Sequence, residues 1–295
     1  MPKRTTPSGP MYCTSDKRIA GIAACSISLF GLAACAKRYP VEGLVLSVDR
    51  AQRTVVVSHR EIRDYMPAMA MPFRVRDAAE LDSLAPGSRV QFQLVVGKKE
   101  SFVRNVWVPE LAPEGLVEDN GQRLRLPPAP GKLAIGAAVP EFTLTDQLSR
   151  TARLSDFRGR VIALNFIYTR CPLPEVCPRL SAGFARLLKR FAGKDVVLLS
   201  VTLDPQYDTP DVLARYGKIW KADPAGWRFL TGDLAEIRRV ADRFGLVWWP
   251  EEGLLTHTSQ TGVIGRDGKL VALVEGSNYS ADQLGDLIAI QLEGH

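Results

Sequence analysis

Two cysteines, Cys171 and Cys177, are the residues with the clearest capacity for chemistry in this sequence. Each is followed by proline, and both come directly after a near-continuous apolar run, 161–167, which is typical of a central strand buried on both faces. A cysteine at a helix N-terminus has a lowered thiol pKa, and its thiolate attacks disulfides or binds metals. We therefore expect a reactive pair, with Cys177 capping a helix that begins at Pro178. An inert disulfide that staples a loop is the alternative.

The elements that must position this pair alternate along the chain after residue 130. Apolar runs predict strands and helical spacing predicts helices, with Thr209 and Asp233 as N-caps. The predicted strands are 141–145, 161–167, 196–203, 261–264 and 270–274, and the predicted helices are 180–191, 210–221, 233–244 and 281–292. This order predicts an α/β domain with a late hairpin. A cysteine pair between a central strand and the next helix is a thioredoxin-like arrangement.

His257 is the third candidate ligand in this part of the chain. It precedes the predicted strand 261–264, and in thioredoxin-like folds that junction lies near the cysteine loop. Two thiolates and one imidazole form a soft donor set suited to copper. The alternative is an ordinary histidine on a surface loop. His295 is terminal and is not expected to take part.

A second group of soft donors lies upstream, where His59 is followed by Met66, Met69 and Met71. Met69 and Met71 are two residues apart, so on a strand they share a face. Thioether and imidazole together suit Cu(I) or Ag(I) and reject hard cations. Methionines that only fill a core, beside a surface histidine, are the alternative. Three methionines beside one of only three histidines favour a metal site.

Short β-branched and alternating runs surround these residues. The predicted strands are 41–48, 54–58, 73–76, 90–96 and 102–108. Five short strands in about seventy residues predict a small all-β barrel. The segment resembles the CusF-like periplasmic copper- and silver-binding domain, an OB-type barrel. Its matching residues are His59, Pro67, Met69 and Met71, while Met66 replaces the tryptophan that caps the metal in that family and is a possible third thioether.

The second domain carries a further resemblance, to the Sco/SenC copper-chaperone family. The matching motifs are Asn165-Phe-Ile-Tyr-Thr-Arg-Cys171-Pro, Cys177-Pro, Thr202-Leu-Asp204-Pro205-x-x-Asp208-Thr209, His257-Thr258 and Ile264-Gly-Arg-Asp-Gly268. The resemblance implies copper ligands at Cys171, Cys177 and His257, and a respiratory oxidase as the recipient of the metal. The family has three residues between its cysteines, whereas this chain has five. A disulfide needs the two Cα atoms within about 7 Å.

The first 35 residues resemble a bacterial lipoprotein signal. Lys17-Arg18 precedes an apolar run over 19–34, and Leu32-Ala33-Ala34-Cys35 resembles a lipobox whose cysteine is lipidated. A similar pattern ending at Cys25 has too little apolar sequence before it. A single membrane-spanning helix is the alternative, but the run is shorter than the roughly 20 residues needed. We expect a lipid-anchored protein of the bacterial cell envelope, facing the periplasm or exterior.

The domain organisation and charge complete the expectation. We predict a signal over 1–35, a CusF-like β-barrel over 41–108, a proline-rich linker over 109–136 and a Sco-like domain over 137–295. The net charge of +6 is scattered among acids, so it favours a solvated surface over nucleic-acid binding.

The leading hypothesis is an envelope copper chaperone that is not itself an enzyme. By resemblance it would deliver copper to cytochrome c oxidase, and its cysteines must be reduced, by an envelope thiol reductant, to bind the metal. A thiol–disulfide oxidoreductase or peroxidase, with Cys171 attacking and Cys177 resolving, is the second hypothesis. Copper resistance by sequestration is the third.

Overall fold

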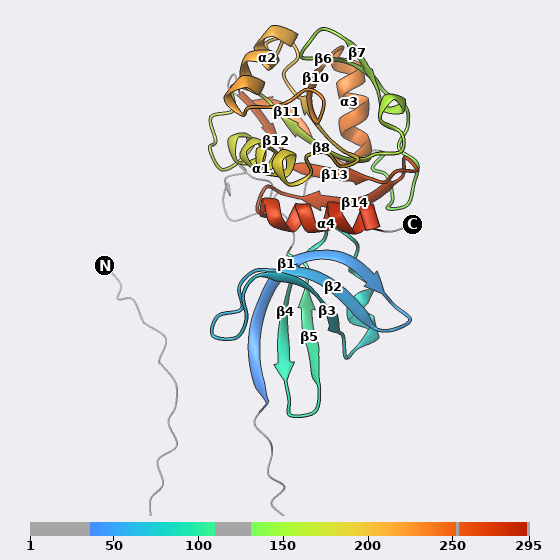
Figure 1. The fold of residues 1–295 in the computed structure, drawn as a ribbon, viewed down its shortest axis with the longest axis vertical. Coiled ribbons are helices and arrows are strands. Elements are labelled where there is room, and N and C mark those ends of the chain that lie inside the picture. The colour runs from blue at the N-terminus through green and yellow to red at the C-terminus, as the bar shows by residue number, and fades with distance from the viewer. Residues whose placement is uncertain (1–35, 110–130, 252–253, 294–295) are drawn as a thin grey trace, which may run out of the picture. The chain divides into compact units, whose positions relative to one another are not determined.

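The computed structural model describes residues 36–109, 131–251 and 254–293 (Figure 1). The chain separates into two units, Met1–Cys35 and Ala36–His295. The predicted signal, Cys35 and most of the predicted linker therefore lie outside the described residues. In the part that is described, no helix is both long and apolar enough to span a membrane.

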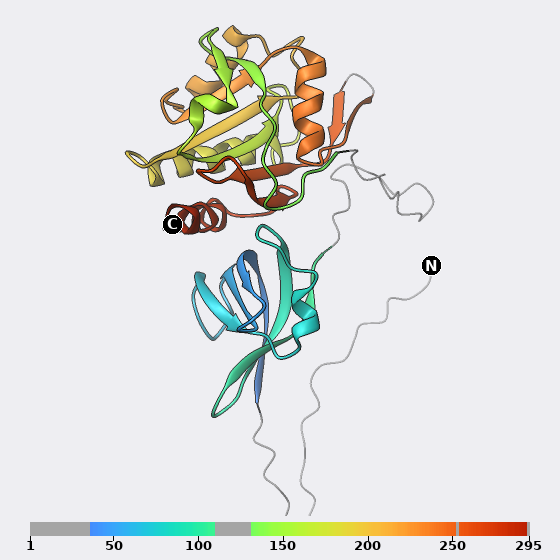
Figure 2. The ribbon, with the colours of Figure 1, turned by 90° about the vertical axis from the view of Figure 1, so that its right-hand side faces the viewer.

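The N-terminal part of the described chain is a five-stranded antiparallel sheet, here called the β domain. Its order is β3-β2-β1-β4-β5, and the strands are β1 (Lys37–Asp49), β2 (Thr54–His59), β3 (Met69–Arg74), β4 (Arg89–Val96) and β5 (Ser101–Trp107). A short 3-10 helix, η1 (Ala78–Leu81), follows β3. The sheet is strongly curved (Figure 2). An isolated bridge joins Val75 to Val103, but no continuous ladder closes the sheet. The all-β prediction is confirmed, while OB-type closure stays a prediction.

One strand of this domain differs from its prediction. The sequence predicted a strand over 73–76, whereas β3 begins at Met69 and ends at Arg74. The proline at position 72 hid this strand, because proline donates no ladder hydrogen bond and usually argues against a strand. β3 is an edge strand in the order of the sheet, where proline is tolerated. The shift places both Met69 and Met71 on a regular strand.

The C-terminal domain is built on a seven-stranded mixed sheet of order β14-β13-β8-β9-β10-β6-β7. The strands are β6 (Thr143–Asp146), β7 (Thr151–Arg153), β8 (Val161–Ile167), β9 (Val196–Thr202), β10 (Trp227–Thr231), β13 (Gln260–Ile264) and β14 (Leu270–Glu275). β8, β9 and β10 are parallel, and β13 and β14 form the predicted late hairpin. Every residue of β8 and β9 is buried, as their continuous apolar runs predict.

Helices cover both faces of this sheet (Figure 1). They are α1 (Cys177–Arg190), α2 (Pro210–Ile219), α3 (Leu234–Arg243) and α4 (Ala281–Glu293), with a 3-10 turn η2 (Leu154–Phe157). Apolar side chains of α1, α2 and α4 share one core cluster, and those of α3 belong to the other. The β8-α1-β9 unit followed by the β13-β14 hairpin and α4 is a thioredoxin-like topology. The predicted α/β domain is therefore confirmed.

A small separate hairpin, β11 (Trp248–Glu251) with β12 (Leu254–His257), was not predicted. Its two strands pair only with each other, and Trp248 lies opposite His257. Strands this short give almost no periodic signal. The hairpin matters because β12 carries His257.

Candidate metal centre

The cysteine loop joins β8 to α1. α1 begins at Cys177 itself, with Val176 as N-cap, so the predicted capping by the Cys177 side chain is wrong by one position. Pro178 then falls in the first helical turn, where its missing N–H costs nothing. Between the cysteines the chain turns back on itself, because Val176 N–H donates to the carbonyl of Leu173 at 3.1 Å. The five-residue gap is therefore folded rather than extended.

The two thiols meet across this loop. The thiol of Cys177 hydrogen-bonds to the sulfur of Cys171, and this bond is the main reason why the pKa of Cys171 falls from 9.0 to about 6. The same bond, followed by burial, raises the pKa of Cys177. Cys177 is fully buried and Cys171 is half-buried. The helix N-terminus predicted a lowered pKa for Cys177, and the exchange hypothesis took Cys171 as the attacking thiolate; the thiol with the lowered pKa is Cys171.

His257 approaches this pair from the β11–β12 hairpin. Its Nδ1 lies 2.9 Å from the carbonyl of Thr258, and donation from Nδ1 puts the lone pair on Nε2, as in metal-binding histidines. The ring of Tyr168 contacts His257 edge-on, with ring centroids 5.7 Å apart. The Tyr168 hydroxyl in turn donates to the carbonyl of Leu255 at 3.2 Å and hydrogen-bonds to Cys171. Tyr168 thus lies against both the histidine and the thiol.

The three predicted ligands do not form a finished coordination site. Within residues 36–109, 131–251 and 254–293, no three His, Cys, Asp or Glu side chains are grouped closely enough to hold a metal ion. The structure does bring the two sulfurs together and links both Cys171 and His257 to Tyr168. The donor types suit a soft metal. A tridentate site with His257 stays a prediction.

A buried carboxylate supports the strand end from which the cysteine loop departs. Asp208 has no exposed surface, and it accepts hydrogen bonds from the Thr169 amide at 3.1 Å, from the Thr169 hydroxyl and from the Thr202 hydroxyl. Burial is the main reason why its pKa is raised. Beside it, Arg170 pairs with Asp204 at 2.6 Å. These bonds tie the chain before Cys171 to the end of β9.

The β domain aligns its own soft donors on one face. His59 lies directly opposite Met69, and Met71 lies opposite Val57, so the three side chains share a face of adjacent strands. His59 is 1% exposed, its Nδ1 lies 2.7 Å from the carbonyl of Arg60, and its Nε2 has no hydrogen-bond partner among the described residues. Such a nitrogen is suited to a metal. Met69 is 48% exposed, so this one thioether is accessible to solvent.

Met66 lies outside this row. It occupies the loop between β2 and β3, where its backbone pairs with Ile62, and its side chain packs against the apolar cluster of the domain. Its role as a third thioether stays a prediction.

His59 and Met69 also line an open pocket of about 630 Å³. The predicted lipidation site, Cys35, lies outside the described residues.

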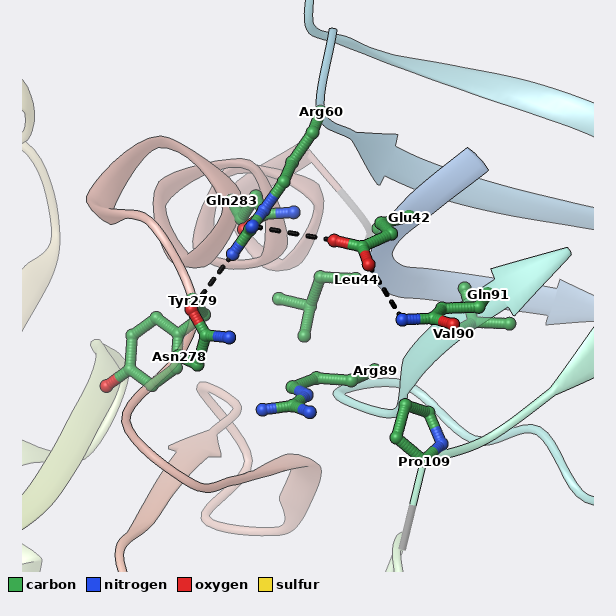
Figure 3. Close-up of a pocket in the computed structure, with 11 residues that line it drawn as sticks. Glu42, Leu44, Arg60, Arg89, Val90, Gln91, Pro109, Asn278, Tyr279 and Gln283 are labelled. Carbon is green, nitrogen blue, oxygen red and sulfur yellow. Dashed lines mark hydrogen bonds and ion pairs between the residues drawn. The ribbon is translucent and has the colours of Figure 1, made fainter. Parts of the chain in front are cut away.

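A second pocket is drawn in Figure 3, and it is not a metal site. Its lining residues include no cysteine, methionine or histidine, and its cavity is about 50 Å³, enough for only a few waters. Arg60 lies near Glu42 at 3.5 Å and donates to Asn278 at 3.0 Å, and Gln91 donates to Glu42 at 2.7 Å (Figure 3). The polar groups in these pairs are hydrogen-bonded or ion-paired with each other.

Reasoning from the sequence missed Tyr168, which contacts two of the three predicted ligands. The signal that could have identified it was its position in the sequence. It is a hydroxyl-bearing residue that directly follows seven buried residues and lies three residues before Cys171. Buried tyrosine hydroxyls usually have a hydrogen-bond partner.

Comparison with known proteins identifies both domains. Residues 133–291 match the SCO1/SenC family model, and residues 38–107 match the model of the copper binding periplasmic protein CusF. The SCO1 protein homolog of Bacillus subtilis is 30% identical over 45% of this chain and 71% of its own length. The mitochondrial SCO1 homolog of Homo sapiens is 26% identical over 44% of this chain and 45% of its own length.

Similar solved structures cover the same region. A SCO1/SenC family lipoprotein from Bacillus anthracis is 27% identical and covers 52% of this chain and 94% of its own, with a TM-score of 0.48. ScoI of Arabidopsis thaliana with copper bound is 24% identical and covers 54% of this chain and 100% of its own, with a TM-score of 0.47. Because the SCO1/SenC model covers more than half of the sequence, the chain belongs to the SCO1/SenC family.

Proposed function

We propose that this protein is a copper chaperone of the bacterial cell envelope with two copper sites. The observation that carries the proposal is that Tyr168 contacts the ring of His257 and accepts a hydrogen bond from the amide of Cys171, whose thiol has a pKa lowered chiefly by Cys177. Thiolate and imidazole donors select copper over the hard cations. The match of residues 38–107 to a copper-binding periplasmic protein supports the same metal and compartment.

In the C-terminal domain, Cys171, Cys177 and His257 would hold the metal as cargo. Cys171 is the thiol that gives up its proton most readily, since its pKa is about 6. Metal binding releases the proton of Cys177 as well. A disulfide between the two sulfurs removes both ligands, so an envelope thiol reductant must precede loading. The influence of Cys177 on the pKa of Cys171 supports this, because it shows that the two thiols interact.

In the β domain, which we propose closes as an OB-type barrel, His59, Met69 and Met71 would bind Cu(I), with Met66 as a further thioether. The exposed Met69 and the unpartnered Nε2 of His59 support this ligand set. Because both sites lie on one chain, each is at high effective concentration for the other, so the β domain would pass copper to the C-terminal domain. A lipid on Cys35 would anchor the chain to the membrane. The recipient implied by the resemblance is the copper centre of cytochrome c oxidase.

Copper titration of the reduced protein tests this function. We expect two separable sites in the wild type, loss of one in Cys171→Ser, and weakened binding at that site in His257→Ala. Tyr216→Phe removes a partly buried hydroxyl that hydrogen-bonds to Ser181 in the same domain and serves as a matched control. If His257→Ala leaves the cysteine-dependent affinity unchanged, the three-ligand site is wrong.

A second function, thiol–disulfide exchange, is favoured by one observation. Cys171 is accessible with a lowered pKa, whereas Cys177 is buried with a raised one, which is the asymmetry of an attacking and a resolving thiol. We expect little peroxide turnover with a thioredoxin-type reductant. Rapid turnover that Cys171→Ser abolishes, without copper dependence, would favour exchange over copper transport.

A further inference from the structure

Tyr168 touches both of the segments that carry the proposed ligands. It follows β8 directly and is only 3% exposed. On one side its hydroxyl donates to the carbonyl of Leu255 at 3.2 Å, and its ring meets the ring of His257 at an interplanar angle of 75°. Leu255 and His257 are two residues apart on β12. Tyr168 therefore contacts the histidine strand at two points.

On the other side Tyr168 contacts the cysteine loop. Its carbonyl accepts the amide of Cys171 at 3.3 Å, and its hydroxyl is one of the groups that lower the pKa of the Cys171 thiol. Its backbone also acts on the pKa of Cys177, in the lowering direction. One residue therefore contacts the imidazole and the cysteine loop through different groups.

The Tyr168 hydroxyl has two possible hydrogen-bond acceptors, which a tyrosine that only fills the core would not need. A phenol has a single hydrogen to donate. Two acceptors compete for it, the carbonyl of Leu255 and the sulfur of Cys171. The position of that hydrogen therefore depends on the hairpin and on the sulfur together, which couples the two.

We propose that Tyr168 is a positioning residue that couples the hairpin carrying His257 to the thiol of Cys171, so that the three copper ligands close as one set. The inference rests on the proposed function, because it concerns the same copper site. The hydroxyl holds the hairpin through the carbonyl of Leu255 and can turn its single hydrogen toward the ligand sulfur instead, and the ring fixes the plane of the imidazole. Outer hydrogen bonds of this kind typically contribute about 10- to 100-fold to metal affinity.

A double-mutant cycle with Tyr168→Phe and His257→Ala tests the coupling, with Tyr216→Phe as the control. The full mature chain is reduced and titrated with copper, and the copper–thiolate charge-transfer band is recorded. We expect Tyr168→Phe to weaken binding by about tenfold and to shift the band, because the sulfur loses a hydrogen bond. We expect His257→Ala to cost less in the Tyr168→Phe background than in the wild type. Tyr216→Phe should leave the band and the His257 effect unchanged.

The outcomes separate this inference from the function on which it rests. If His257→Ala weakens binding equally with and without the Tyr168 hydroxyl, the coupling is wrong while the copper site stands. If His257→Ala has no effect in the wild type, both are wrong. Should Tyr168→Phe fail to fold, nuclear Overhauser contacts between the Tyr168 and His257 rings are measured in the wild type. Their presence with copper bound supports the coupling, and their absence both with and without copper overturns it.

Discussion

Replacing Cys177 with alanine should raise the pKa of the Cys171 thiol. The hydrogen bond from Cys177 is the largest cause that lowers this pKa from 9.0 to about 6. Alanine has no hydrogen to donate, so this cause disappears. The bonds from the Tyr168 hydroxyl and from the backbone amides remain. We therefore expect the pKa to move most of the way back toward its ordinary value.

The reaction rate at neutral pH is a poor measure of this change. At pH 7 a thiol of pKa about 6 is roughly 90% thiolate and one of pKa 9.0 is about 1%, a ratio of roughly ninety. Intrinsic nucleophilicity falls with the pKa, and a Brønsted coefficient of about 0.4–0.5 over three units offsets roughly twenty- to thirtyfold. The net rate difference is then only about fourfold. The pH midpoint, by contrast, moves by whole units.

The assay is alkylation of Cys171 by iodoacetamide in reduced, metal-free protein, followed by peptide mass spectrometry from about pH 5 to pH 10, a range that brackets both pKa values. We expect a midpoint near 6 in the wild type and a clearly higher one in Cys177→Ala. Cys177→Ser keeps a hydroxyl donor at the same position and should fall between them. A wild-type midpoint near 9, or one that Cys177→Ala leaves unmoved, would refute the reasoning.

Three further predictions follow from the structure. In a background that carries Cys171→Ser and Cys177→Ser, the additional changes Met69→Leu and Met71→Leu should abolish Cu(I) binding. The free energy of unfolding should change little, since methionine-to-leucine substitutions cost less than about 1.5 kcal/mol. Retained Cu(I) binding would show that the two thioethers only fill the core. Asp208→Ala should destabilise by roughly 3–5 kcal/mol, because it leaves two hydroxyls and the Thr169 amide without their acceptor, and Asp208→Asn by less; urea unfolding that finds a loss under about 1 kcal/mol for alanine contradicts this. Because the pKa of Cys171 is lowered in the fold, its ionisation adds stability as pH rises from about 6 toward 9, and this contribution is lost as pH falls through about 6. The raised pKa of Cys177 acts in the opposite sense above pH 9. The melting temperature of the reduced wild type should therefore rise more over that interval than that of Cys171→Ser, and parallel curves would contradict it.

The sequence predicted those elements whose signal is local and strong. The buried runs became β8 and β9, and both predicted N-caps formed, with Thr209 accepting from the Val212 amide and Asp233 from two amides of α3. The strand β10 was missed, although Trp227 is fully buried and its indole donates to Ser200. Five residues without a clean period are too few to recognise.

The candidate ligands could be proposed from the sequence, but the electrostatics around them could not. Residue types and spacing identify Cys171, Cys177 and His257 as soft donors. Which of the two thiols has the lower pKa depends on which one donates the hydrogen bond across the folded loop, and on the complete burial of Cys177. These are tertiary facts that no local pattern contains. The helix dipole, which motivated the prediction for Cys177, is outweighed there by burial and by a direct bond to another thiol.

The two proposed ligand sets would respond differently to oxidation, and this difference would set the direction in which copper moves. Cys171 and Cys177 hydrogen-bond to each other, so an oxidant can join them and remove both ligands at once. His59, Met69 and Met71 include no thiol and cannot be closed in this way. In an oxidising envelope the β domain would therefore hold Cu(I) while Cys171 and Cys177 of the C-terminal domain stay joined in a disulfide. Reduction of the pair would leave Cys171 as a thiolate and Cys177 as a thiol that loses its proton only when the metal binds. Two thiolates would bind Cu(I) more strongly than neutral thioethers, so copper would then move from the methionines to the cysteines.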